Sequence, residues 1–382
     1  MKKAIMALDG GGSNLRMLVV DADTEKELYF KQINTGTNLS TVSNKEEALE
    51  NIKNIVIDGH LHTPRDYVLT GIGLSSAGTE IQENKDSLEK ALQEVIETLK
   101  ISSDRVNNNP PKYYVTNDID ILLHSSDIAL VAGTGTVGAV KYKDIKPYDN
   151  IYEIPEEYVI EKFDGNGQFL GDKGAGYWIG KEVLKRVAEI DNIGGYIDSK
   201  GKFVEAEESY LKELVFDTMF KELGIPEHKL KTALEKGLKE AELPEYVSLV
   251  YSATTVNGKP FDRAKVGNLF SKIADDAAKY GDSAANDILK HSSIELFKNV
   301  KAAYEKGNFA NKEECNLLLS GSVLVHSDIV RYFLETVVKE KYPNVNIKVN
   351  REKPVWSTIR YVKDKLCIAS KEKTGHSEDI ER

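Results

Sequence analysis

Short stretches rich in apolar and β-branched residues alternate along this chain with longer amphipathic stretches. The short stretches predict strands. The longer ones, whose apolar residues recur every three or four positions, predict helices. In the first third of the chain, strands are predicted at 4–8, 16–20, 67–74 and 112–116, and helices around 43–56 and 88–99. Such alternation is typical of an α/β fold.

The first predicted helix carries a start signal. Ser43 and Glu46 have the spacing of a capping box, in which each side chain bonds a backbone N–H at the start of the helix. After it, Ala48, Ile52 and Val56 fall on one face of the helix. We therefore expect this helix to begin at Ser43.

The opening pattern of the chain returns near residue 128. An apolar strand at 128–132, a turn of small residues at 133–136 and a second strand at 137–142 repeat the order seen at 4–20. Self-similarity of this kind indicates a repeated architecture. We therefore expect two halves of one topology facing each other.

The remainder of the chain is predicted to be mostly helical. Helices are expected at 174–190, 205–223, 262–280 and 283–307. Strands at 315–319 and 345–349 alternate with helices at 327–341 and 356–370. This pattern predicts an N-terminal domain at 1–120 and a second domain, enlarged by helices, at 121–355. The helix at 356–370 is expected to pack back on the first domain.

Length and charge limit the classes of protein to be considered. The chain has 382 residues, 41% of them hydrophobic and 29% charged, which is ordinary for a globular protein of two or three domains. Its 51 Lys and Arg residues against 61 Asp and Glu residues give a net charge of −10. A global field that would attract nucleic acid or an anionic membrane is therefore excluded. A phosphate ligand would need a local field of backbone amides and a few cations.

The two cysteines, Cys315 and Cys367, lie far apart and form no CxxC motif. A disulfide framework and a four-cysteine zinc site are excluded, and a reducing compartment is expected. No apolar run approaches the roughly 18 residues that a membrane helix needs. The apolar stretch at 4–8 is too short for a signal peptide, so we expect a cytoplasmic protein.

The turn at 9–13, Asp-Gly-Gly-Gly-Ser, joins the first two predicted strands. Its glycines let backbone amides approach an anion closely, and Ser13 can donate to a phosphate oxygen. Asp9, at the end of a strand, can hold a hydrated Mg²⁺ ion, which keeps most of its waters. The alternative is a plain glycine-rich hairpin. The turn matches neither GxxxxGK[ST] nor GxGxxG, so the P-loop and Rossmann signatures are lacking.

The turn at 133–136, Gly-Thr-Gly-Thr, is the counterpart of that motif in the repeat. One hairpin in each half would supply two cradles of amides and hydroxyls for a polyphosphate lying between the halves. Two ordinary hairpins are the alternative.

Residues 320–323, Ser-Gly-Ser-Val, directly follow an apolar strand. Gly321 lets the backbone approach a flat ligand such as a nucleobase. In isolation, the motif is also explained by a strand–helix turn with a serine cap.

Asp118 follows the strand at 112–116, at the edge of an α/β sheet where ligands gather. Phosphoryl transfer uses such a carboxylate to accept the proton of the attacking hydroxyl. Asp120 and Asp127 are competing candidates for this role. An Asx turn that ends the strand is the structural alternative.

Residues 165–174 form a loop in which glycines are interleaved with Asn166, Gln168 and Asp172. Amide and carboxylate groups of this kind are suited to binding sugar hydroxyls. A long polar loop that leads into a helix is the alternative.

These motifs share their order and spacing with a known family. They are DGGGS at 9–13, NLS at 38–40, LSSAG at 74–78, TND at 116–118, AGTGT at 132–136, GDKGAGYWIG at 171–180 and LSGSVL at 319–324. Together they resemble the N-acetylglucosamine kinase family and its BadF/BadG/BcrA/BcrD ATPase relatives, which belong to the actin, hexokinase and heat-shock chaperone superfamily. The resemblance spans about residues 4–326.

The resemblance implies two RNase H-like domains hinged around a cleft, with ATP and Mg²⁺ at its bottom. The positions that match ATP and phosphate contacts are Asp9, Gly11, Gly12, Ser13, Thr134, Gly135, Gly321 and Val325, with Asp9 holding Mg²⁺ through water. The positions that match sugar contacts are Asn38, Asp118, Thr136, Gly165, Asn166, Gly167, Gln168 and Asp172. Asp118 falls on the family's catalytic base. The implied activity is transfer of the γ-phosphate of ATP to the 6-hydroxyl of an amino sugar such as N-acetylglucosamine or glucosamine, by a homodimer.

The chain also departs from the family pattern. Asn166 stands where many relatives have Trp, and Lys173 replaces the Glu of Gly-Asp-Glu-Gly. Two alternatives therefore stay open. One is an activator ATPase that acts on a dehydratase and shares an iron–sulfur cluster between subunits. The other is a regulator that binds a nucleotide or sugar without turnover.

Overall fold

The computed structural model describes residues 1–11, 14–102, 106, 108, 110–143, 158–206 and 209–378, without the side chains of 102, 168 and 368–378. The chain divides into two compact units. The first comprises Met1–Ser125 and Glu352–Arg382, and the second comprises Ser126–Arg351. No helix within the described ranges is long and apolar enough to cross a membrane.

The first unit is built on a five-stranded sheet with the order β3-β2-β1-β4-β5. The strands are β1 (Lys2–Gly10), β2 (Leu15–Asp21), β3 (Glu27–Ile33), β4 (Tyr67–Ser76) and β5 (Lys112–Thr116). The first three strands form an antiparallel meander, whereas β1, β4 and β5 run parallel. The carboxyl ends of these three parallel strands therefore meet at one edge.

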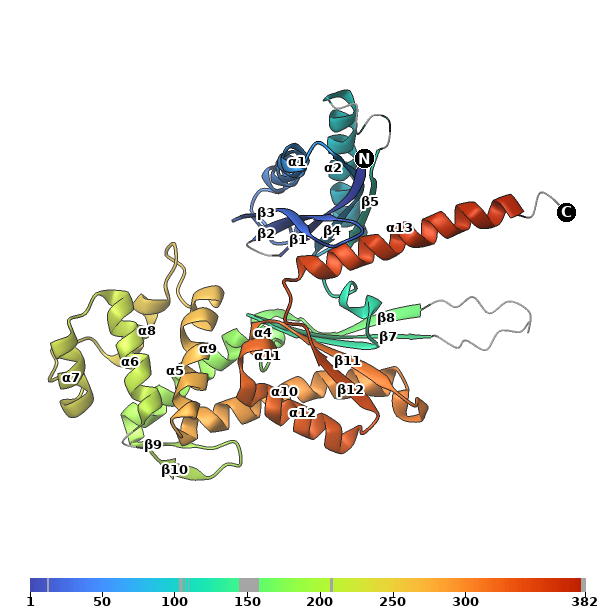
Figure 1. Ribbon diagram of the computed structural model, residues 1–382. Coiled ribbons are helices and arrows are strands. Elements are labelled where there is room, and N and C mark those ends of the chain that lie inside the picture. Colours follow the sequence, from blue (N-terminus) through green and yellow to red (C-terminus); the bar gives the residue numbers. More distant parts are fainter. Residues whose placement is uncertain are drawn as a thin grey trace. The chain divides into compact units, whose positions relative to one another are not determined.

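Helices cover both faces of this sheet (Figure 1). The helices α1 (Lys45–His62) and α2 (Gln82–Ser102) pack on one face, and α13 (Val355–Glu378) packs on the other. Along β1, Met6 faces α1 and α2, while Ile5 faces α13. Burial on both faces explains why β1 is an unbroken apolar run rather than an alternating one.

The second unit repeats this topology. Its five-stranded sheet has the order β12-β11-β6-β7-β8, again an antiparallel meander extended by parallel strands. The strands are β6 (Ile128–Ala132), β7 (Thr136–Lys143), β8 (Tyr158–Asp164), β11 (Cys315–Ser320) and β12 (Val345–Val349). The repeat predicted from the sequence is confirmed as a duplicated sheet.

The second unit also carries most of the helices. They are α4 (Gly167–Leu170), α5 (Gly176–Ile193), α6 (Tyr210–Leu223), α7 (Glu227–Lys236), α8 (Tyr246–Thr254), α9 (Arg263–Lys279), α10 (Ser283–Lys306), α11 (Ser322–His326) and α12 (Asp328–Lys341). A small sheet of β9 (Gly195–Ile197) and β10 (Phe203–Glu205) follows α5. One hydrophobic core joins the helices α5 to α10 with the sheet.

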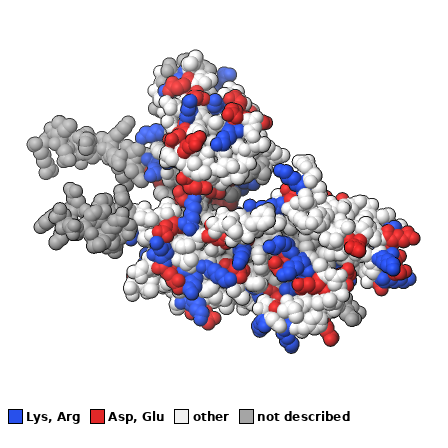
Figure 2. All heavy atoms as spheres, turned by 180° about the vertical axis from the view of Figure 1, so that it is seen from behind, with Lys and Arg blue, Asp and Glu red and all other residues white. Residues whose placement is uncertain are grey.

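Charged side chains of both signs are interspersed over the face drawn in Figure 2. This agrees with the sequence, whose acidic excess is spread along the chain rather than gathered in one block. Because no large region of one sign covers this face, the charge of a binding site depends on the few charged side chains next to it.

The start of α1 differs from the sequence prediction by one residue. Asn44, not Ser43, is the N-cap, and its Oδ1 accepts a hydrogen bond of 3.1 Å from the Glu47 backbone N–H. The prediction of a capping box at Ser43 and Glu46 is therefore wrong. Asparagine is as strong an N-cap as serine, so local spacing alone does not distinguish neighbouring candidates.

Asn44→Ala is expected to lower the free energy of unfolding by about 1 kcal/mol, because an exposed helix N–H loses its acceptor. Ser43→Ala, at an exposed neighbouring position, is the matched control and should change it by less than about 0.5 kcal/mol. Urea unfolding of both variants measures the difference. Equal losses would contradict the assignment of Asn44 as the cap.

Candidate functional site

Polar side chains meet at the carboxyl edge of the first sheet. Asp9 of β1 lies opposite Ser75 of β4, and Ser75 lies opposite Thr116 of β5. The Ser75 hydroxyl donates to Asp9 Oδ1 at 3.3 Å. Asp118 follows β5 by two residues and is exposed at this edge. The structure thus brings Asp9 and Asp118 to the same edge of the sheet, as expected for a ligand site.

Asp9 is buried, with 8% of its surface exposed. Its Oδ2 lies 3.2 Å from a guanidinium nitrogen of Arg16, its cross-strand neighbour. Burial raises the pKa of the Asp9 carboxyl, while Arg16 and the Ser75 hydroxyl oppose the rise. Both carboxylate oxygens therefore already have polar partners.

The first glycine-rich turn packs against the segment that contains Asn38. A side chain on Gly10 would overlap Thr37, so glycine is required there by close approach. The Thr37 N–H donates to Gly11 O at 2.9 Å, and Thr37 Oγ1 lies 2.8 Å from Ser76 Oγ. Gly12 and Ser13 lie outside the described residues.

Asn38 and Asp118 are linked through the segment that follows β4. A β-carbon on Gly78, whose φ is +84°, would overlap Asn38 Oδ1. Asn117, directly before Asp118, donates from Nδ2 to Glu80 Oε2 at 2.8 Å. Asn38 Oδ1 also accepts from the Ser40 N–H at 3.0 Å, which fixes its orientation. Asn38 and Asn117 thus both contact the segment 78–80 that follows β4.

In the second unit, the turn at 133–136 is tied to the start of α5. The Gly176 N–H donates to Gly133 O at 2.8 Å, and the Tyr177 N–H donates to Thr134 O at 3.1 Å. Thr134 and Gly135 remain partly exposed at the tip of the turn. The sequence therefore places a short, well-anchored turn at the end of β6.

Asp172 supports this turn from inside the unit. Only 4% of its surface is exposed, and its Oδ1 accepts from the Thr136 N–H at 2.8 Å. Its Oδ2 is ion-paired with Arg263, the first residue of α9. Thr136 is also buried, and its hydroxyl donates to Val131 O. Arg263 was not a candidate from sequence, because it lies far along the chain from the turn that it contacts.

The loop at 165–171 is more exposed. Gly165 and Gly167 adopt φ values of +73° and +77°, which glycine tolerates best. Asn166 is exposed and is the N-cap of α4. Phe169 and Leu170, which the sequence analysis did not single out, are 89% and 82% exposed. Of Gln168 only the backbone is described.

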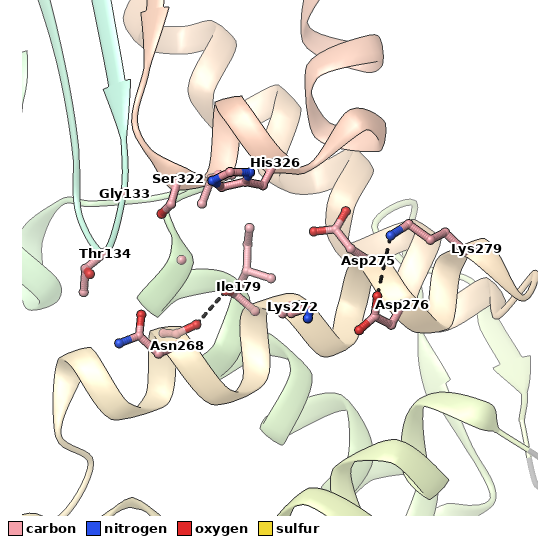
Figure 3. A pocket seen from close by; sticks show the side chains of 14 residues that line it. Gly133, Thr134, Ile179, Asn268, Lys272, Asp275, Asp276, Lys279, Ser322 and His326 are labelled. Atoms are coloured by element: carbon pink, nitrogen blue, oxygen red, sulfur yellow. Dashed lines mark hydrogen bonds and ion pairs between the residues drawn. The ribbon is translucent and has the colours of Figure 1, made fainter. Parts of the chain in front are cut away.

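A cavity of about 410 Å³ opens beside the turn at 133–136, which is within the usual range for a small-molecule site. It is lined by Gly133, Thr134, Gly176, Ile179, Gly267, Asn268, Ser271, Lys272, Asp275, Asp276, Lys279, Ser322, Val323 and His326 (Figure 3). Gly321 has a φ of +92°, and a side chain there would overlap the Ala132 backbone.

The residues after Gly321 form the lining on that side of the cavity. Val323, rather than the expected Val325, lines the cavity. Val325 instead donates its N–H to Gly321 O at 3.0 Å within the same turn.

Comparisons with known proteins agree with this architecture. A kinase of N-acetylmuramic acid and N-acetylglucosamine from Clostridium acetobutylicum is 23% identical over 351 residues, covering 90% of this chain and 93% of the relative. An N-acetyl-D-glucosamine kinase from Dictyostelium discoideum is 19% identical over 361 residues, covering 91% and 93%. Both relatives support the expectation of an ATP-dependent sugar kinase.

Two solved structures share the fold. A Chromobacterium violaceum protein, provisionally assigned as an N-acetylglucosamine kinase, aligns with a TM-score of 0.55 at 13% identity, covering 94% of this chain and 98% of the other. The hexokinase of Schistosoma mansoni, solved with glucose, aligns with a TM-score of 0.50 at 14% identity, covering 94% and 85%. The expected fold of two actin- and hexokinase-like domains is confirmed.

A family model extends this agreement to the sequence itself. The BadF/BadG/BcrA/BcrD ATPase model matches residues 156–357, which is more than half of the chain. The match includes the loop at 165–174, the pocket face of α9 and the turn at 320–323. The chain belongs to the BadF/BadG/BcrA/BcrD ATPase family.

Proposed function

We propose that this protein is an ATP-dependent kinase that phosphorylates the 6-hydroxyl of an amino sugar such as N-acetylglucosamine or glucosamine. The observation that carries the proposal is the duplicated glycine-rich turn. Each unit presents one at the end of a strand, and Asp118 is exposed at the carboxyl edge of the first. The names of the two relatives from Clostridium acetobutylicum and Dictyostelium discoideum support an amino sugar as the substrate.

In this proposal, the two turns hold the phosphates of ATP. Gly11, Gly12 and Ser13 act in the first unit, and Thr134 and Gly135 act in the second. Backbone amides are suited to this task because they bind anions without adding net charge. The cavity beside Thr134 takes the adenosine, and Gly321 begins the turn whose next two residues, Ser322 and Val323, line that cavity.

The proton chemistry falls to Asp118. Its carboxylate accepts the proton of the sugar hydroxyl as that oxygen bonds to the γ-phosphorus, and the bond to the β–γ bridging oxygen breaks to release ADP. Asn38 and the loop residues Gly165, Asn166, Gly167 and Gln168 orient the sugar. Thr136 and Asp172 are both buried, so in this proposal they support the turn at 133–136 rather than contact the sugar directly.

The residues present fit a Mg²⁺ ion held mainly by phosphates and water. Within the described part of the chain, no group of three or more His, Cys, Asp and Glu side chains could hold a metal on its own. Mg²⁺ commonly uses one carboxylate plus substrate phosphates, and Asp9 supplies that carboxylate, through water. When bound, the ion would neutralise charge on the β- and γ-phosphates.

The proposal is tested by measuring ADP release from ATP with Mg²⁺ against a panel of amino sugars, plain hexoses and no sugar. We also propose that the chain forms a homodimer, which size-exclusion chromatography with light scattering of the same preparation tests. Strong stimulation by an amino sugar supports the kinase. ADP release that is equal with and without every sugar would overturn it in favour of an ATPase with a protein partner.

The alternative function, an activator ATPase with a shared iron–sulfur cluster, requires cysteines that bind the cluster, whereas the kinase does not. Cys315 is fully buried in β11, so its thiol is not at the surface, where a cluster shared between two subunits would need it. Cys367 is exposed on α13. We expect a thiol reagent to modify Cys367 rapidly and Cys315 only after unfolding, and anaerobically purified protein to lack iron–sulfur absorbance. A cluster spectrum would reverse the choice between the two functions.

A further inference from the structure

One face of α9 forms the floor of the cavity. Gly267, Ser271, Asp275 and Lys279 recur every four residues along it, and Asn268, Lys272 and Asp276 lie beside them. With a rise of about 1.5 Å per residue, Gly267 and Asp275 are about 12 Å apart along the helix. Figure 3 shows Thr134 at one end of the cavity and Asp275, Asp276 and Lys279 at the other.

The charges of the cavity distinguish these two ends. Gly267 lies against Thr134, at the turn that we assign to the phosphates. The part of the cavity around Asp275 and Asp276 is also lined by Lys272 and Lys279, so its charges cancel and it has no excess of positive charge to hold phosphates, whereas the turn offers backbone amides to an anion. A nucleotide whose phosphates lie at the turn therefore directs its base toward Asp275.

The carboxyl group of Asp275 is held in place by a neighbouring helix. Its Oδ1 accepts a hydrogen bond from the hydroxyl of Ser327, which is 2% exposed and is the N-cap of α12. Figure 3 shows the carboxyl group directed into the cavity. Asp276, in contrast, has its own counter-ion, because Lys279 lies 3.5 Å away.

We propose that Asp275 selects the base of the nucleotide, by accepting a hydrogen bond from the 6-amino group of adenine. This inference rests on the proposed use of a nucleotide. Inosine carries a carbonyl oxygen in place of that amino group, so an acceptor would face an acceptor. Sites built around a hydrogen bond reject analogues that leave it unmade. Burial raises the pKa of Asp275 to about 6, so above that pH the group is mainly an acceptor.

The test is equilibrium binding of ATP, ITP and 2′-deoxy-ATP to the full chain by calorimetry at pH 8, without sugar. The wild-type chain should prefer ATP to ITP by about 10- to 100-fold, the range for a hydrogen bond to a charged group. Asp275→Ala should lower the affinity for ATP by that factor and leave the affinity for ITP within about threefold of the wild-type value. Asp276→Ala is the matched control and should change ATP and ITP alike.

Asp275→Asn keeps the size of the side chain and can direct its N–H₂ group into the cavity. We expect this variant to shift the preference toward ITP, and thermal unfolding confirms that each variant is folded. The assignment would be overturned if Asp275→Ala weakened the binding of ATP and ITP equally. It would also be overturned if the substitution weakened ATP but not 2′-deoxy-ATP, because Asp275 would then contact the ribose rather than the base. Because no sugar is present, such a failure leaves the kinase standing, whereas a chain that binds neither nucleotide overturns both.

Discussion

Asp118→Asn is expected to lower kcat by about 100- to 10,000-fold while leaving the KM values for ATP and sugar nearly unchanged, which is the usual effect of removing a general base. The amide keeps the size and polarity of the side chain but cannot accept the hydroxyl proton. Since Asp118 is exposed, the substitution should not change the free energy of unfolding by more than about 0.5 kcal/mol. Steady-state kinetics with the best sugar measures the effect.

Asp127→Asn tests whether Asp127, the competing candidate, is the general base instead of Asp118. Asp127 accepts from Lys312 Nζ at 2.7 Å and from the Asn316 N–H at 2.8 Å, so its oxygens hold β11 in place. We expect this variant to lose stability but to keep kcat within a few-fold when folded. A normal kcat in Asp118→Asn would remove Asp118 from the mechanism.

Arg263→Gln is expected to lower the free energy of unfolding by about 3 kcal/mol, the lower end for breaking a buried ion pair, because the arginine is partly exposed. The loss arises because the Asp172 carboxylate, with 4% of its surface exposed, is left without the guanidinium group that pairs with it. The Asp172 carboxylate also holds the Thr136 N–H, so the turn at 133–136 should shift and the KM for ATP should rise. Chemical unfolding and ATP kinetics measure the two effects.

The double variant Arg263→Gln/Asp172→Asn tests that cause. Without the buried charge, it should be more stable than Arg263→Gln alone, even though it carries one more substitution. Lys265→Gln is the matched control on the same helix, where Lys265 pairs instead with Glu222. A double variant that is less stable than Arg263→Gln would contradict the account of an uncompensated charge.

Much of the fold follows from local patterns. Strands β5, β6 and β12 match their predicted bounds. Helix α9 is one residue shorter than predicted at each end, and α10 begins as predicted and ends one residue earlier. These elements have strong apolar periodicity, which local sequence expresses directly. The repeated order of apolar strand, glycine-rich turn and apolar strand was enough to predict two related halves.

Two of the missed strands, β3 and β8, lie at the edges of the two five-stranded sheets. Strand β3 has no fully buried residue, and β8 alternates between exposed and partly buried positions. Such edge strands carry little apolar signal, because only one neighbour and part of one face pack against them. The prediction of a helix from residue 205 was also wrong. Residues 203–205 form β10, and Ser209 caps α6 through the Lys212 N–H.

Some residues of the candidate site could likewise be predicted from local sequence, and others could not. The glycine-rich turns and the strand-end Asp118 are contiguous in sequence, so their spacing indicates them. The contact of Arg263 with Asp172 joins residues 91 positions apart, and no local pattern marks it. Asp275 looks like an ordinary polar position of an amphipathic helix until α11 and the start of α12 are folded against it.

The identity of the phosphate acceptor tests the central claim most directly. The protein, ATP and the sugar that gives most ADP release are incubated together, and the products are followed by phosphorus nuclear magnetic resonance. The account predicts one sugar phosphomonoester on the 6-hydroxyl for each ADP formed, with no matching amount of inorganic phosphate. Inorganic phosphate equal to ADP, with the sugar unchanged, would contradict phosphoryl transfer to a sugar.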